Sequence, residues 1–204
     1  MREHQPADAG FHAGELAVQR RAGVQAQAAR LSRMLEPVEL DGGIVGFLAD
    51  RTFAAMTGRD GEGCLWISPL TGPPGFLRVA SLTALEVSTS IPPGDPLHGL
   101  DADQPVAVVV AEFATRRRVR LNGTLARASD DLLIIEVEQA YGNCPQYIQQ
   151  RVLASAPLSQ ADADQVRHGR TLTSEAIDLI RAADTFFLGT TNPERGSDAS
   201  ESVA

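Results

Sequence analysis

The sequence predicts a mostly β fold with flanking helices, in which short antiparallel strands close into a barrel. Between residues 44 and 141, short apolar or alternating runs are separated by Gly, Pro and Asp, a pattern typical of strands and tight turns. Seven or eight such runs favour a barrel, because closure removes the exposed edges of an antiparallel sheet. The runs are IVGFLAD, FAAMTG, CLWISPL, GFLRVAS, ALEVSTS, PVAVVVAEF, RRVRLNGTLARA and LLIIEVEQAY.

Helical patterns flank these runs. Residues 14–35 are rich in Ala, Gln and Arg, with apolar residues at helical spacing and a break near Gly23. Two more helices are expected later, one beginning near Asn143 and one capped by Thr173 or Ser174. The predicted parts are an N-terminal helical segment (1–36), the barrel (37–141), a helical connection (142–184), and an incomplete second-barrel strand with a polar tail (185–204).

Charge and composition narrow the class of partner. A net charge of −8 argues against nucleic acid or an anionic membrane surface, because the long-range field repels phosphates. The longest apolar stretch, Pro105 to Phe113, is too short to span a bilayer. With two cysteines and no apolar run at the start, a cytoplasmic protein is expected. The histidines and cysteines lack metal-ligand spacing, so no metal site is predicted.

The densest cationic cluster in the barrel region is ATRRRVRLNGTLARAS. The period of a strand would place Arg116, Arg118 and Arg120 on one face. Guanidiniums hold phosphate through paired hydrogen bonds, so this face suits an anionic ligand. The alternative is a solvated strand whose charges resist aggregation. Asn122 and Gly123, which follow, predict a bulge or a tight turn.

Two further segments offer groups to a ligand. A helix start near Asn143 and Gln146 would present free backbone N–H groups, which bind phosphate or carboxylate. The same helix start could activate Cys144, although a cysteine beside a proline is more often a capping or packing residue. In WISPLTGPPGF, the hydroxyls of Ser68 and Thr71 would face a ligand at a strand end, or the segment only turns the chain.

An internal repeat is also visible. The segment DTFFLGTTNPERGSDAS resembles FLADRTFAAMTGRDGEG, since in both Phe and Leu precede a small residue, threonines and a polar turn with Gly. A strand after Phe186 would have apolar side chains to bury and no later strand in this sequence to pair with. We therefore expect a homodimer, in which this strand pairs with a barrel edge of its own or the neighbouring subunit.

In this order, several segments resemble the pyridoxamine-phosphate-oxidase-related flavin-nucleotide-binding family over Phe11 to Ser200. The resemblance implies a six-stranded split β-barrel with flanking helices, and FMN bound between two barrels of a dimer or of tandem domains. Gln146 stands where related sequences carry a lysine, and the sequence ends before a second barrel is complete. The segments are FHAGELAVQRRAGV, FLADRTFAAMTGRDGEGCLWISPLTGPPGFLRV, RRRVRLNGTLARA, VEQAYGNCPQYIQQR and ADTFFLGTTNPERGSDAS.

The resemblance implies an FMN-dependent oxidoreductase acting on a small molecule, with a deazaflavin or haem as alternative cofactors. The three arginines and the helix start near Asn143 and Gln146 would hold the phosphate. Asn122 would also contact the cofactor, and Ser68 and Thr71 would approach the ring or the ribityl chain. Because the isoalloxazine would carry out the transfer, no catalytic side chain is required. The alternative function is a non-catalytic flavin-binding or interaction module.

Overall fold

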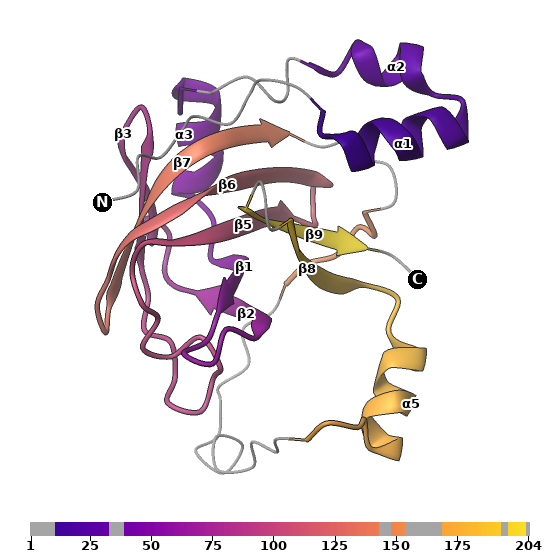
Figure 1. Cartoon of the computed structure of the whole chain (residues 1–204). Coiled ribbons are helices and arrows are strands. Elements are labelled where there is room, and N and C mark those ends of the chain that lie inside the picture. Colours follow the sequence, from indigo (N-terminus) through magenta and orange to yellow (C-terminus); the bar gives the residue numbers. More distant parts are fainter. Residues whose placement is uncertain (1–10, 33–38, 143–147, 154–168, 193–195, 203–204) are drawn as a thin grey trace.

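A computed structural model of the chain describes residues 11–32, 39–142, 148–153, 169–192 and 196–202 (Figure 1). Seven of its strands form one antiparallel sheet, in the order β2-β1-β5-β6-β7-β4-β3. The sheet curls around a core while its edge strands β2 and β3 stay unpaired with each other, as in a split barrel, so the predicted fold class is confirmed. The strands are β1 (Phe53–Arg59), β2 (Leu65–Thr71), β3 (Leu77–Ser81), β4 (Ala84–Ser88), β5 (Gln104–Glu112), β6 (Arg117–Ala128) and β7 (Leu132–Gly142).

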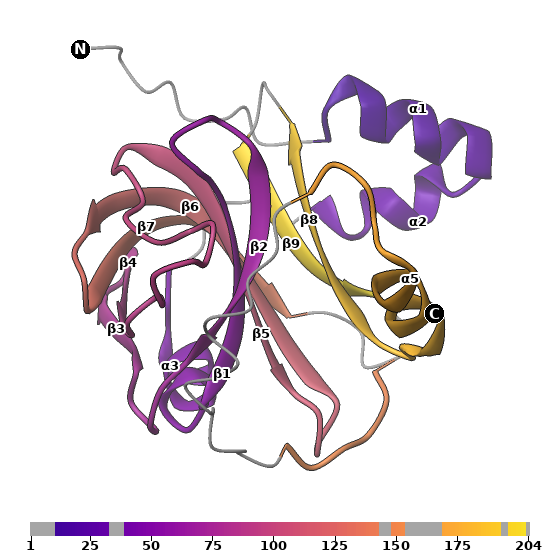
Figure 2. The ribbon, with the colours of Figure 1, turned by 90° about the horizontal axis from the view of Figure 1, so that it is seen from below.

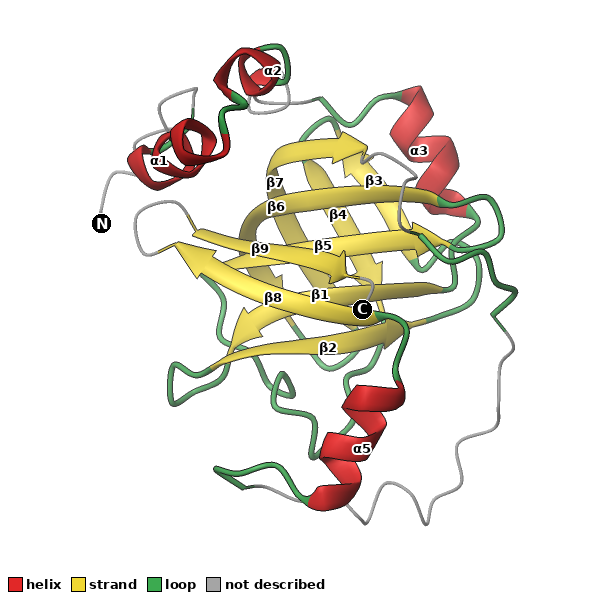
Figure 3. Ribbon diagram, turned by 90° about the vertical axis from the view of Figure 1, so that its right-hand side faces the viewer, coloured by secondary structure: helices red, strands yellow, loops and turns green. Residues whose placement is uncertain are grey.

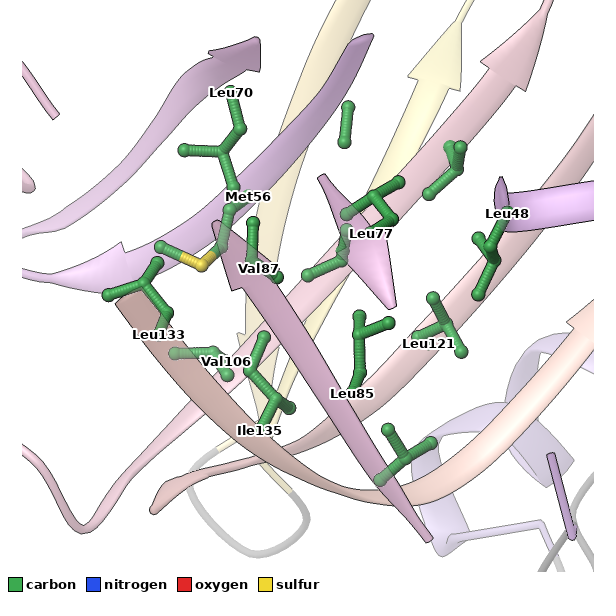
Figure 4. Packing of buried hydrophobic residues seen from close by; sticks show 14 of the residues in the cluster. Leu48, Met56, Leu70, Leu77, Leu85, Val87, Val106, Leu121, Leu133 and Ile135 are labelled. Carbon is green, nitrogen blue, oxygen red and sulfur yellow. The ribbon is translucent and has the colours of Figure 1, made fainter. Parts of the chain in front are cut away.

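The inner face of the curled sheet encloses the apolar core. On β5, Val106, Val108 and Val110 point into this core and have no solvent exposure. Burial of each such side chain stabilises the fold by roughly 1.5–3 kcal/mol, so a slip of one residue in register would be costly. Figure 4 shows the same packing for Met56, Leu70, Leu77, Leu85, Val87, Leu121, Leu133 and Ile135.

The prediction of a strand at IVGFLAD is wrong, because this run forms helix α3 (Gly42–Ala49). Asp41 caps the helix, and its side chain accepts a hydrogen bond from the Gly43 N–H. The apolar residues Ile44, Phe47 and Leu48 pack on the core at helical spacing. A short apolar run does not reveal by period alone whether it forms a buried strand or a helix. The other seven predicted runs are the seven strands of the sheet.

The N-terminal helices agree with the prediction. Helix α1 (Ala13–Ala22) and helix α2 (Gln25–Ala29) are separated at Gly23, which has a left-handed φ of 69°. Helix α5 (Ser174–Ala182) is capped by Thr173, whose side chain accepts from the Ala176 N–H, as predicted.

The helix predicted to begin near Asn143 is wrong for residues 148–153, which are not helical, while Asn143 itself lies outside the described residues. Ile148 is instead buried against Ala111 and Phe113. The Arg151 N–H donates to the carbonyl of Phe113, so this segment obtains its partners from the β5–β6 turn.

A second sheet covers the outer face of the first. Strand β8 (Phe186–Asn192) pairs antiparallel with β9 (Gly196–Ser202), so the prediction of one unpaired strand and a polar tail is wrong. In Figures 2 and 3, β8 lies over β1 and β2, and β9 crosses β1, β5 and β6. The rings of Phe187 and Phe53 pack with their centroids 5.4 Å apart. The order helix, strand, strand is shared by α3-β1-β2 and α5-β8-β9, in agreement with the internal repeat.

The bulge predicted at Asn122 and Gly123 is present. Asn122 pairs with Gln139 but Gly123 pairs with Val137, so one residue of β7 is left over. A Cβ at Gly123 would overlap the carbonyl oxygen of Glu136, so only glycine permits this approach of the two strands.

We expect Gly123→Ala to lower the free energy of unfolding by about 3 kcal/mol, because the backbone of β7 must move to admit the methyl group. Gly142→Ala is the matched control on β7, since its Cβ would meet the Arg118 carbonyl oxygen at an ordinary 3.8 Å. Its effect should stay below about 1 kcal/mol. Urea denaturation measures both, and equal losses would contradict this role of Gly123.

Candidate ligand-binding site

The outer face of the sheet, beneath the β8–β9 hairpin, carries the candidate site. Strand pairing aligns side chains on this face in rows that run across the strands. Along these rows, the side chains on β1 and β5 are mostly small or apolar, whereas those on β6 and β7 are polar or cationic. The rows contain Ala111 and Arg118; Ala55, Val109, Arg120 and Tyr141; and Thr57, Ala107, Asn122 and Gln139.

Arg118 and Arg120 lie on this outer face and are half-buried, as the period of the strand predicts. The prediction that Arg116 shares their face is wrong. Arg116 has a left-handed φ of 55° in the β5–β6 turn and is exposed, because the strand begins one residue later. Arg117 points to the other side, with its guanidinium 5.0 Å from the centroid of the Phe47 ring.

Asn122 adds a hydrogen-bonding group beside the arginines. Its Nδ2 donates to Oε1 of Gln139 at 3.3 Å, while its Oδ1 is buried and meets no partner in the described part of the chain. A buried acceptor without a donor is uncommon in folded proteins and often marks a place where a ligand binds. Two guanidiniums and this acceptor fit a ligand that carries both a phosphate and an N–H donor.

Thr57 is a second such group and was not found from the sequence. Its side chain is fully buried, and its Oγ1 meets no partner among the described residues. Gly189 of β8 lies directly above it, since a Cβ at Gly189 would come within 2.7 Å of that oxygen. Strand alternation in β1 would have placed Thr57 on the face of Arg120. Sequence reasoning also missed Gln139 and Tyr141, which share this face only because the register shift at Gly123 reverses the alternation of β7.

The structure does not bring Ser68 to this face. Ser68 is buried on the core side of β2, where its hydroxyl donates to Oδ1 of Asp95 at 2.6 Å. Thr71 is exposed at the end of β2, opposite Phe53 and three strands from Arg118, a separation of about 14 Å. Asn143 and Gln146 lie outside the described residues.

A charged cluster closes the adjacent end of the barrel. Glu112 accepts a hydrogen bond from Thr115 and pairs with Arg51, and these contacts hold the pKa of its carboxyl below the usual range. The guanidiniums of Arg51 and Arg117 each lie 5.0 Å from the centroid of the Phe47 ring. Cation–π contacts and the ion pair together fix α3 on the barrel end.

A cavity of about 120 Å³ lies beside this cluster. Its walls include Phe53 and Ala111, which also belong to the outer face, together with Arg51, Glu112 and Arg151. The cavity therefore adjoins the candidate site.

Metal ligation and membrane insertion were assessed for residues 11–32, 39–142, 148–153, 169–192 and 196–202. No group of three or more His, Cys, Asp and Glu side chains within them is placed to hold a metal ion. None of the helices in these ranges has the length and apolar character needed to cross a membrane.

Neither a protein-family model nor a curated protein sequence matches the chain. Seven chains of solved structures match it, and three of them cover about half of it. A single-residue variant of HupZ from Group A Streptococcus is 12% identical, covers 51% of this chain and 99% of its own, and has a TM-score of 0.39. A second HupZ structure is 12% identical, covering 50% and 93%, with a TM-score of 0.37. A proposed pyridoxamine 5'-phosphate oxidase from Lactobacillus delbrueckii is 15% identical, covering 50% and 93%, with a TM-score of 0.37. At this level of similarity, family and function are left open, and the fold assignment rests on the sheet of the chain itself.

We expect Glu112→Gln to flatten the pH dependence of stability. A carboxyl whose pKa is lowered by folding stabilises the protein above its unfolded pKa, and this contribution is lost as the pH falls through the folded pKa. Wild-type protein should therefore lose more free energy of unfolding than the variant between about pH 6 and pH 3. Urea denaturation across this range measures the difference, with Glu62→Gln at an exposed carboxyl as control. Parallel curves for wild type and Glu112→Gln would contradict the role of the ion pair.

Proposed function

We propose that the outer face binds FMN and that the protein is an FMN-dependent oxidoreductase acting on a small molecule. The observation that carries this proposal is the pair of half-buried guanidiniums of Arg118 and Arg120 beside the buried Oδ1 of Asn122, which meets no partner among the described residues. In a chain of net charge −8, cations held on a covered face favour one anionic ligand over non-specific contacts with polyanions.

Different residues of this face are proposed to hold the phosphate and the ring of FMN. Arg118 and Arg120 hold the phosphate, since a guanidinium forms two parallel hydrogen bonds with a phosphate group. The small side chains Ala55, Ala107 and Ala111 form a floor on which a planar ring can lie. When bound, the flavin supplies hydride or electron transfer, while the protein binds it, orients it and excludes water.

Replacement of Arg118 and Arg120 by Ala is expected to weaken FMN binding by at least about 2 kcal/mol, or roughly 30-fold, the scale of a few charge-assisted hydrogen bonds. Arg127→Ala is the matched control, because Arg127 is an exposed arginine farther along β6. Fluorescence titration with FMN measures the dissociation constants. Unchanged affinity in the double variant would assign these arginines to the solvated surface of a strand.

The absorbance spectrum of the purified protein separates the possible cofactors and roles. A flavin spectrum bleached by a nicotinamide donor supports the oxidoreductase. A flavin spectrum that no donor bleaches indicates a non-catalytic flavin-binding module. A deazaflavin or haem spectrum, or protein that takes up no added FMN, contradicts the choice of FMN.

We also propose that the protein is a homodimer. Phe186 and Leu188 on the outward side of β8 are 43% and 47% exposed, and β8 carries no charged residue that would discourage pairing. Light scattering during size-exclusion chromatography should give twice the chain mass of 21.7 kDa, and Leu188→Glu should return it to one chain. A wild-type mass near 21.7 kDa at every concentration would exclude the dimer.

A further inference from the structure

Two buried polar groups lie in one row beneath the β8–β9 hairpin. Thr57 on β1 pairs with Ala107 on β5, which pairs with Asn122 on β6. Two strand spacings therefore separate Thr57 from Asn122, a distance of about 10 Å between their backbones. The Oγ1 of Thr57 and the Oδ1 of Asn122 are both buried and meet no partner in the residues that the structure describes.

These two buried polar groups lower the stability of the structure in which the β8–β9 hairpin covers the row. A buried hydroxyl without a partner is destabilising, whereas valine would fill the same space beside Ala107 and Gly189 with no polar atom to satisfy. Departures of this kind are expected at sites that serve a ligand. The row is thus shaped for a partner that the hairpin does not supply.

The hairpin is attached in a way that permits its removal. β8 and β9 form their own two-stranded sheet and add no strand to the seven-stranded one. Such a hairpin is marginally stable alone, so lifting it would cost mainly side-chain contacts such as Phe187 on Phe53. Gly189 sits so close to Thr57 that nothing fits between them while the hairpin is seated.

We infer that the row from Thr57 to Asn122 is the slot for the flavin ring, and that the β8–β9 hairpin is a displaceable cover over it. The inference rests on the proposed function and adds two positioning contacts to it. The pyrimidine end of the ring carries an N–H donor for Oδ1 of Asn122 and carbonyl oxygens for the Thr57 hydroxyl. Arg120 and Arg118 continue along β6 from Asn122, so the phosphate and the ring occupy successive parts of one face.

The first test uses the protein without added ligand. Thr57→Val removes the unpartnered hydroxyl and should seat the hairpin more firmly, so amide hydrogen exchange across Phe186–Asn192 should slow several-fold. Gly189→Ala should clash with Thr57 and speed the same exchange. Thr190→Val is the control, because Thr190 is exposed. If Thr57→Val leaves the exchange unchanged or speeds it, Thr57 does not weaken the docking of the hairpin, and the inference of a displaceable cover is wrong.

The second test separates the ring from the phosphate by comparing FMN with riboflavin, which lacks the phosphate. Thr57→Val should weaken both ligands by the same factor, about tenfold, whereas Arg118→Ala should weaken FMN alone. If Arg118→Ala acts on FMN but Thr57→Val affects neither ligand, the slot is wrong and the proposed function stands. If wild-type protein binds neither flavin, the proposed function and the ring slot both fail, and the exchange data alone decide whether the hairpin is a cover.

Discussion

Strand β5 is buried on both of its faces, and much of the structure follows from this constraint. Its valines Val106, Val108 and Val110 enter the core, while Ala107, Val109 and Ala111 on the other side are at most 3% exposed. An antiparallel sheet commonly leaves one face in water, so the outer face of β5 requires a cover. The β8–β9 hairpin provides it, and small side chains on β1 and β5 let that hairpin approach closely.

In the proposed binding mode, the cover links the stability of the fold to ligand binding. Phe187 packs on Phe53 and on Ala111, so the hairpin buries apolar surface at one end of the face. Toward Thr57 and Asn122 the same hairpin lies over polar atoms that meet no partner among the described residues. The apolar contacts favour the seated hairpin, and under the proposal the polar atoms favour its replacement by a ligand.

Features governed by short-range chemistry were predictable from the sequence. The seven strands, the glycine break after α1, the Thr173 cap and the bulge at Asn122 each follow from a local pattern. Helix α3 was not, because a short apolar run fits either secondary structure. Strand β9 has the composition of a loop and becomes a strand by pairing with β8.

The residues of the candidate site were likewise predictable from the sequence only in part. Arg118 and Arg120 were identified from the period of one strand, and Arg116 was misplaced because the turn ends one residue later than expected. Thr57 could not be recognised, since its importance depends on Gly189, far away in the sequence, being docked above it. Contacts of this kind depend on tertiary packing and leave no local signature.

The slip of one residue at Gly123 also decides which side chains of β7 reach the outer face. Had the lower register of β6 and β7 continued without it, Gln139 would stand opposite Leu121, and Tyr141 would turn from Arg120 toward the core. A single backbone irregularity thus keeps two polar side chains of β7 beside the arginines of β6.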